Sequence, residues 1–146
     1  MKKIIWMLII SVLAFAIDLT YSKAFQYYKK GLKLHKTNPS EAQKYFKESF
    51  FLTKELESQN KASSQIYFML GEMYHKGWGT DKNLFLAEKY YLKALKLGNK
   101  RVNCPLAKLY KEIGKEKLAK KYLQDSLKNA STKKECEDFK EIKEKK

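Results

Sequence analysis

Along most of the chain, small, aliphatic and aromatic residues recur at intervals of three and four with charged residues between them, which predicts amphipathic helices. The pattern predicts seven helices, at residues 25–36, 39–58, 61–76, 83–97, 101–113, 115–128 and 131–144. The run Asn38-Pro39-Ser40-Glu41 is typical of a helix start, since asparagine can cap the helix and proline suits its first turn. Gly98 is a natural stop after the fourth helix. We therefore expect an all-α fold.

One order of side chains occurs three times, in residues 42–49, 87–94 and 119–126. Each segment begins with alanine, has tyrosine three positions later and a bulky residue after it, and ends with serine or alanine. Small side chains at these intervals share one helix face, where they let a neighbouring helix approach closely. A second correspondence, at a spacing of 36, joins Leu70, Gly71 and Tyr74 to Leu106, Ala107 and Tyr110. The pattern predicts a helix A, a turn and a helix B in each of three units, at about 25–58, 61–98 and 101–128.

The second unit resembles a Sel-one-like repeat, a close relative of the tetratricopeptide repeat, over residues 66–98. The residues that correspond to the family pattern are Leu70, Gly71, Tyr74, Gly77, Gly79, Lys82, Asn83, Ala87, Tyr91, Ala94, Leu97 and Gly98. The chain departs from the usual residue at Thr80, Asn83 and Leu95. The third unit has the spacing of a plain tetratricopeptide repeat. The resemblance implies an α/α superhelix (a solenoid) of about three helix-turn-helix repeats, with a C-terminal capping helix at 131–144.

The amino terminus has the pattern of a secretory signal. Two lysines precede an almost unbroken apolar run at residues 4–17, which is shorter than a membrane-spanning helix of about 20 residues. A small-x-small site ends at Ala24, so we expect residues 1–24 to be a cleaved signal peptide and residues 25–146 to form the repeat domain. Cleavage after Ala16 and an uncleaved inner-membrane anchor are the alternatives. The expected location is the bacterial periplasm or the outside of the cell.

The chain is strongly basic, with 31 lysines and arginines against 16 acidic residues and a formal net charge of +15. Without residues 1–24 the balance is 28 − 15, or +13. Arg101 is the one arginine among these bases, whereas proteins that read nucleic-acid sequence rely on the guanidinium fork. We therefore expect no specific nucleic-acid partner. The lysines would give weak electrostatic contact with a membrane or cell wall, so a basic protein that binds cell wall or anionic lipid is one alternative function. Most of the lysines should form solvated helix faces.

Cys104 and Cys136 are the only two cysteines, and in an oxidising compartment an even pair is a disulfide candidate. They should lie near the starts of neighbouring helices, whose axes pack about 8–10 Å apart, so a bond between them is geometrically reasonable. Two free buried thiols are the alternative. The two histidines, His35 and His75, have no spacing to the cysteines that is typical of a zinc site. We expect neither a metal nor a cofactor.

The sequence favours no catalytic site. Gly77-Trp78-Gly79 follows a helix whereas a phosphate loop follows a strand, so a repeat turn is the better interpretation, with Trp78 packed on the turn or the next unit. Ser58-Gln-Asn-Lys61 and Ser131-Thr-Lys-Lys134 have the Ser-x-x-Lys spacing of penicillin-interacting enzymes, but the other elements of that motif are absent. A β-lactamase-like or other cell-wall-related hydrolase is the alternative, because some cysteine-bearing relatives in the resembled family carry that label.

In the tetratricopeptide family, the inner faces of the A helices line a concave groove that holds peptides. The resemblance implies the corresponding positions here, which are Gln65, Phe68, Glu72, His75, Lys76, Arg101, Lys108, Lys111 and Glu112, with Cys104 on the same face. This set is net basic, so we expect an acidic protein or peptide partner and the role of a non-catalytic adaptor or scaffold. The alternative is that three units make too short a groove and that these side chains are merely solvated.

Overall fold

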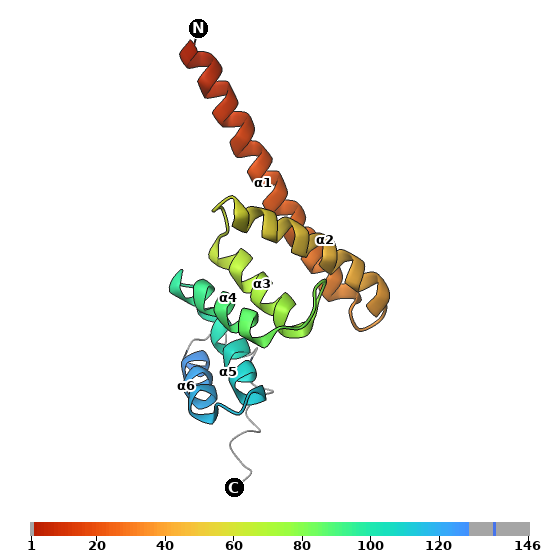
Figure 1. The fold of residues 1–146 in the computed structure, drawn as a ribbon, viewed down its shortest axis with the longest axis vertical. Helices are drawn as coiled ribbons and strands as arrows, with labels where there is room; N and C mark the ends of the chain where they lie inside the picture. Colours follow the sequence, from red (N-terminus) through yellow and green to blue (C-terminus); the bar gives the residue numbers. More distant parts are fainter. Residues whose placement is uncertain (1, 129–135, 137–146) are drawn as a thin grey trace. The chain divides into compact units, whose positions relative to one another are not determined.

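The computed structural model describes residues 2–128 and residue 136. Within them the chain forms six α-helices and one 3-10 helix, and no strand (Figure 1). In chain order these are α1 (Lys2–Leu34), α2 (Pro39–Ser58), α3 (Ser64–Lys76), α4 (Leu84–Lys96), η1 (Lys100–Val102), α5 (Asn103–Glu112) and α6 (Glu116–Leu127). The predicted all-α fold is confirmed.

The helix bounds agree with the predicted ones in the middle of the chain and differ at its start. The bounds of α2 are as predicted, and α3, α4 and α6 differ from prediction by at most three residues at either end. The prediction for the first helix was wrong, because α1 begins at Lys2 and not at residue 25. No glycine or proline before Gly31 interrupts it. The predicted helix at 131–144 lies outside the described residues apart from Cys136.

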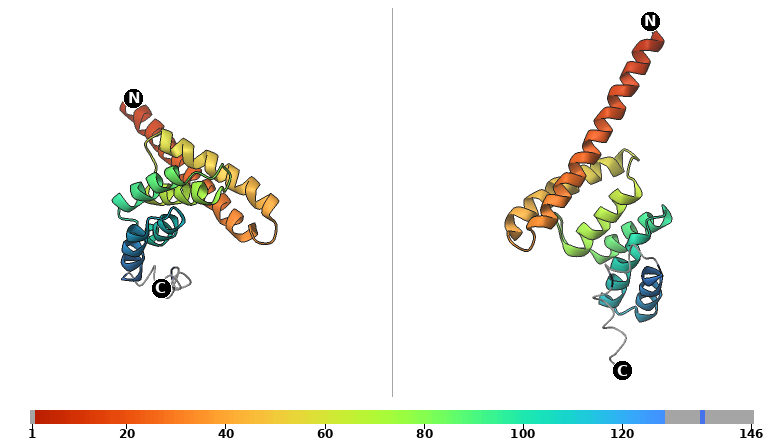
Figure 2. Two further views of the ribbon diagram at one scale, coloured as in Figure 1. Left: turned by 60° about the horizontal axis from the view of Figure 1, so that its bottom comes forward. Right: turned by 180° about the vertical axis from the view of Figure 1, so that it is seen from behind.

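The chain divides into two compact units. Unit 1 comprises residues 1–62 and 78–81, and unit 2 comprises residues 63–77 and 82–146. In unit 1, α1 packs along α2, and α1 is the longer helix, so its amino-terminal part extends beyond α2 (Figures 1 and 2). In unit 2, α3 packs along α4, and α5 along α6. These three helical hairpins correspond to the three predicted units, and their stacking into one superhelix stays a prediction.

The ends of several helices are fixed by the residues that the sequence indicated. The Asn38 side chain accepts a hydrogen bond from the Glu41 amide (3.2 Å) and donates one to the Glu41 carboxylate (2.9 Å). Asn83 caps α4 by accepting from the Leu86 amide at 2.9 Å. Gly77 ends α3 in the left-handed region with φ 70°, where a residue without Cβ is favoured.

The same close contact between a glycine and an aromatic ring occurs within each of the first two hairpins. A Cβ added at Gly31 would lie 2.5 Å from the Phe46 ring, and one added at Gly71 would lie 2.4 Å from the Tyr91 ring. Phe46 and Tyr91 occupy the same place in the repeated order of side chains. The small residues that begin and end this order are all buried, namely Ala42, Ser49, Ala87, Ala94, Ala119 and Ser126. The repeat seen in the sequence is therefore also a repeat of helix contacts.

Trp78 packs within unit 1. Its ring stacks on Phe46 with a centroid distance of 4.6 Å, and the neighbouring Gly79 amide donates to Gln43 Oε1 at 2.8 Å. A Cβ at Gly79, where φ is +71°, would lie 2.4 Å from the Phe46 carbonyl carbon. Gly79 thus lets the chain approach α2 closely. The prediction that Trp78 packs on its own turn or on the next unit was wrong, because its stacking partner belongs to the preceding hairpin.

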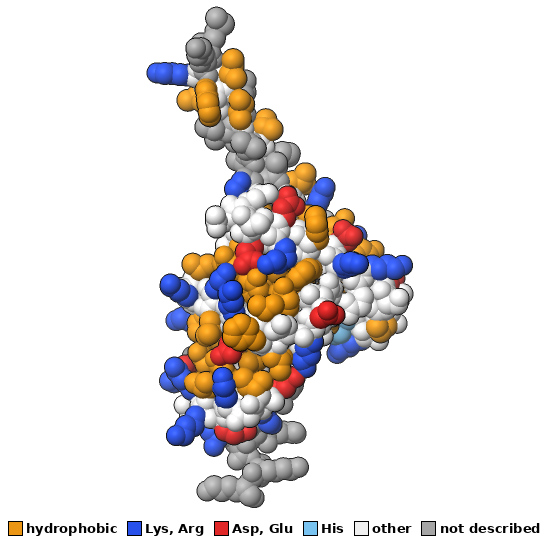
Figure 3. All heavy atoms as spheres, in the orientation of Figure 1, with side chains coloured by type: hydrophobic (Ala, Val, Ile, Leu, Met, Phe, Trp, Pro, Cys, Tyr) orange, Lys and Arg blue, Asp and Glu red, His pale blue; other side chains and the backbone are white. Residues whose placement is uncertain are grey.

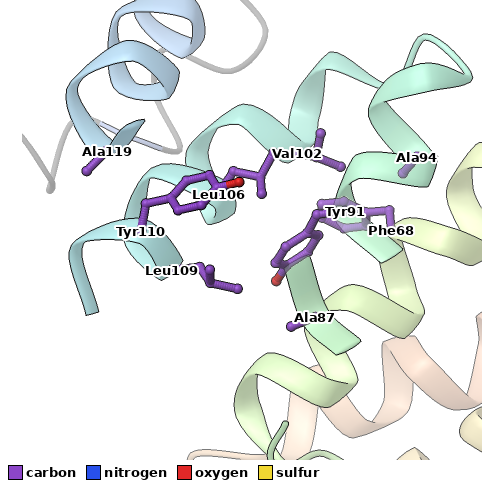
Figure 4. Packing of buried hydrophobic residues seen from close by; sticks show 9 residues of the cluster. All are labelled: Phe68, Ala87, Tyr91, Ala94, Val102, Leu106, Leu109, Tyr110 and Ala119. Carbon is purple, nitrogen blue, oxygen red and sulfur yellow. The ribbon is translucent and has the colours of Figure 1, made fainter. Parts of the chain in front are cut away.

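The core of unit 2 joins side chains from both of its hairpins. Leu106 and Leu109 of α5 are directed toward Phe68 of α3 and Tyr91 of α4 (Figure 4). A second cluster contains Ala107, Leu123 and the disulfide between Cys104 and Cys136, whose Cα atoms are 5.7 Å apart. The predicted disulfide candidate is therefore bonded, and the alternative of two free thiols is wrong.

Candidate binding face on α3 and α5

His75 joins the two helices that were predicted to line the groove. It lies near the end of α3 and is only 3% exposed. Its Nε2 lies 3.1 Å from the carboxylate of Glu112, at the end of α5. Its Nδ1 lies 3.2 Å from the hydroxyl of Tyr91, on α4. Residues separated by 16 and 37 positions in the chain thus meet around one imidazole.

Two further polar contacts complete this network. The Tyr91 hydroxyl donates to the Glu72 carboxylate at 2.6 Å. The Lys82 ammonium forms an ion pair with the second oxygen of Glu112. We call these five side chains the His75 network, made of Glu72, His75, Lys82, Tyr91 and Glu112. Each carboxylate in it is held by a donor on another element, so the orientation of both is fixed.

Hydrogen bonding and burial act in opposite directions on the protonation of His75. The Tyr91 hydroxyl donates its one proton to Glu72, and the Glu112 carboxylate can only accept. Both ring nitrogens therefore face acceptors, which suits the imidazolium. Burial opposes that charge and is the larger effect, so the pKa of His75 is lowered from its usual 6.5 although the hydrogen bond to Glu112 raises it. The hydrogen bond from Lys82 lowers the pKa of Glu112, partial burial opposes this, and His75 adds to the lowering.

The other end of the face is joined by an aromatic contact. The guanidinium of Arg101, in η1, lies over the ring of Phe68, 5.5 Å from its centroid. Phe68 lies about one turn before Glu72 and about two turns before His75 on the same side of α3, as positions 68, 72 and 75 share a helix face. The face of α3 therefore meets the α5 side of unit 2 at two places, Phe68–Arg101 and His75–Glu112.

The structure places the predicted groove residues in three different environments. Phe68 and His75 are buried, so they support the face rather than form an open wall. Gln65, Glu72 and Lys108 are half-buried. The exposed members are Lys76, Arg101, Lys111 and Glu112. Cys104 is buried in the disulfide. The sequence did not indicate Lys82 and Tyr91 as parts of this face, because both match the repeat pattern and the pattern alone accounts for them.

The other features considered from the sequence are the two serines, metal ligands and a membrane-spanning segment. The Ser58 hydroxyl donates to the Glu55 carbonyl at 2.7 Å at the end of α2, and Ser131 lies outside the described residues. Among residues 2–128 and 136, no cluster of three or more potential metal ligands occurs. In the same part of the chain, no helix has the length and apolar content needed to cross a membrane. On the side drawn in Figure 3, lysine and arginine side chains are spread over the helices in view.

Comparisons of the chain with protein-family models, with curated proteins and with solved structures gave no match.

Proposed function

We propose that this protein is an exported interaction module that binds an acidic segment of a partner protein on the α3–α5 face of unit 2, without catalysis. The observation that carries the proposal is the His75–Glu112 contact, which joins a buried side chain of α3 to an exposed carboxylate of α5. A face whose side chains are already ordered loses less conformational entropy when a partner binds.

Charge supports an acidic partner. The exposed or half-buried cations on or beside this face are Lys76, Lys82, Arg101, Lys108 and Lys111, against the carboxylates Glu72 and Glu112. Both carboxylates are engaged by donors within unit 2, so the face as a whole is positive. Such a surface attracts acidic segments and speeds their association at low ionic strength.

The repeat contacts and the disulfide support the remaining parts of the proposal. The matching Gly31–Phe46 and Gly71–Tyr91 contacts fit a Sel-one-like array whose hairpins form a short superhelix. The Cys104–Cys136 bond fits an oxidising compartment, as expected for a periplasmic or secreted protein. Partner recognition by ordered helical hairpins requires no cofactor.

A binding assay with charge variants tests the proposal. Fluorescence anisotropy should show that a labelled glutamate-rich peptide binds, whereas a glutamine-rich peptide of equal length does not. The pair Lys76→Glu and Lys111→Glu should weaken binding at least tenfold. The control pair Lys117→Glu and Lys120→Glu makes the same change of charge at exposed positions of α6, and it should have little effect.

Two outcomes would overturn the proposal. Equal weakening by both pairs would show diffuse attraction to a basic surface instead of a defined face. Hydrolysis of nitrocefin that Ser58→Ala abolishes would establish the hydrolase alternative. Circular dichroism of each variant must show unchanged helicity for the comparison to hold.

A further inference from the structure

A second basic feature of unit 2 lies away from the His75 network, beside α6. It is a hollow of about 540 Å³ whose lining residues are Leu95, Lys100, Asn103, Lys121, Tyr122, Asp125 and Lys128. They come from α4, η1, the first turn of α5, and α6 together with the residue that follows it. The hollow lies within the size range of small-ligand sites, which is about 300–1,000 Å³.

Comparison of the second and third hairpins shows which residue differs at the hollow. In the second hairpin, Tyr90 is stacked by two rings, Tyr67 at 6.2 Å and Tyr74 at 5.5 Å between centroids. Tyr122 is the corresponding residue of the third hairpin, and it is stacked by Tyr110, which corresponds to Tyr74.

The place that corresponds to Tyr67, 36 residues later, is occupied by Asn103. Asparagine is much smaller than tyrosine, so the space that a second ring would fill next to Tyr122 is open. Asn103 is only 6% exposed, so its side-chain amide forms part of the inner wall. Asn103 therefore places an amide at the hollow where the second hairpin has a ring.

The charge of this hollow differs from that of its counterpart in unit 1. Three lysines and one carboxylate line it, and the carboxylate, Asp125, lies 3.5 Å from Lys128, so the lining is net +2. A hollow of about 530 Å³ occurs at the corresponding place of the first hairpin, beside Tyr27 and Tyr45. Its charged residues are one lysine and two glutamates, so its lining is net −1. The repeat therefore produces similar hollows, and only the one beside α6 is suited to an anion.

We propose that the hollow beside α6 binds a phosphate-class anion. A phosphate group carries close to two negative charges near neutral pH, which match the net charge of the lining, whereas a single carboxylate would leave it positive. Ammonium groups bind phosphate as point charges, and the Asn103 amide can donate further hydrogen bonds. The proposal is independent of the α3–α5 face, because the two sites share no residue.

Isothermal titration with sodium pyrophosphate tests the site at constant ionic strength, since diffuse attraction is screened by salt. The full chain with its disulfide intact should bind one equivalent, and sodium acetate should not compete. Asn103→Tyr replaces the Asn103 amide with the ring that the second hairpin has at this position, and it changes no charge. It should weaken binding at least tenfold.

A charge variant keeps the test decisive if Asn103→Tyr lowers the melting temperature. Lys100→Gln, Lys121→Gln and Lys128→Gln combined should abolish binding. The control combination Lys89→Gln, Lys117→Gln and Lys120→Gln, which removes equal charge at exposed positions, should preserve it. Equal losses of binding in both combinations would overturn the proposal. So would an unaltered protein that binds neither pyrophosphate in solution nor vesicles that contain phosphatidic acid.

Vesicles containing phosphatidic acid distinguish the source of the phosphate. Cosedimentation that Asn103→Tyr weakens would assign the phosphate to a lipid headgroup. Binding of pyrophosphate without cosedimentation would assign it to a soluble compound. Binding in both assays that Asn103→Tyr leaves unchanged would refute a defined site.

Discussion

Loss of the Cys104–Cys136 bond is expected to lower the free energy of unfolding of unit 2 by about 4 kcal/mol. The two cysteines are 32 positions apart, and the bond closes that length of chain into a loop in the unfolded state. The chain-entropy relation for such a loop gives about −12 cal/mol/K, or about 3.7 kcal/mol at 25 °C. The bond also joins two side chains that are at most 2% exposed, so its loss disturbs a packed cluster.

Urea unfolding followed by circular dichroism at 222 nm measures this loss. Three samples separate the contributions, namely the oxidised protein, the protein reduced with dithiothreitol, and the double variant Cys104→Ala and Cys136→Ala. The reduced protein keeps the sulfur atoms, so its deficit reports mainly the loop. The further deficit of the double variant reports packing around Ala107 and Leu123.

Two results would refute this reasoning. The first is a reduced protein whose free energy of unfolding lies within 1 kcal/mol of the oxidised one, because the loop would then provide no restraint. The second is a count of two free thiols in protein purified from its native compartment without reductant. Dithiothreitol should leave the double variant unchanged, and this controls for other effects of the reagent.

Three further predictions follow from single contacts. Because burial lowers the pKa of His75 below 6.5, the unfolded chain protonates there first, so the contribution of His75 to stability is complete above pH 6.5 and is lost as pH falls toward the lowered folded-state value. Urea midpoints should thus change less with pH in His75→Gln, and equal slopes would contradict this. A chain starting at Phe25 should be about 1–3 kcal/mol less stable than one starting at Ile17, because the buried Ser49 hydroxyl donates to the Ala24 carbonyl at 2.9 Å. Removing that hydroxyl by Ser49→Ala should reduce the difference in stability between the two chains. Equal thermal midpoints of the two chains without this substitution would refute the role of the hydrogen bond. Gly79→Ala should cost at least about 2 kcal/mol and change Trp78 fluorescence, whereas Gly98→Ala, which has positive φ and open space around it, should cost only about 1 kcal/mol; similar costs would contradict the predicted clash.

The helices and their pairing could be predicted because they depend on residues only a few positions apart in the sequence. The caps at Asn38 and Asn83 involve residues three apart, and the buried alanines follow a period that any helix imposes. The start of α1 could not be predicted in this way. The apolar run at residues 4–17 predicts a signal peptide, and this stays a prediction; its residues also allow one helix to continue into the hairpin. Ala24, after which cleavage is expected, is buried in unit 1, and its carbonyl accepts a hydrogen bond from Ser49.

The candidate site could be predicted only in part, for a related reason. Helical spacing places His75 on the same side of α3 as Glu72, and the resemblance places Glu112 on the facing side of α5. Neither indicates that His75 is buried, because burial depends on which side chains of α4 and α5 cover it. Trp78 is a similar case, since its partner Phe46 is 32 residues away and belongs to the preceding hairpin.

Tyr91 shows how a structural repeat can carry a site that its own pattern does not record. The ring of Tyr91 contacts Gly71, and in the first hairpin a phenylalanine, Phe46, makes the same contact with Gly31. The first two hairpins therefore use an aromatic ring at this position and the third has Leu123, so the repeat itself does not require a hydroxyl there. The hydroxyl of Tyr91 meets Glu72 and His75, and the first hairpin has no equivalent of it. The ring thus belongs to the architecture, and the hydroxyl is what gives the α3–α5 face its fixed polar side chains.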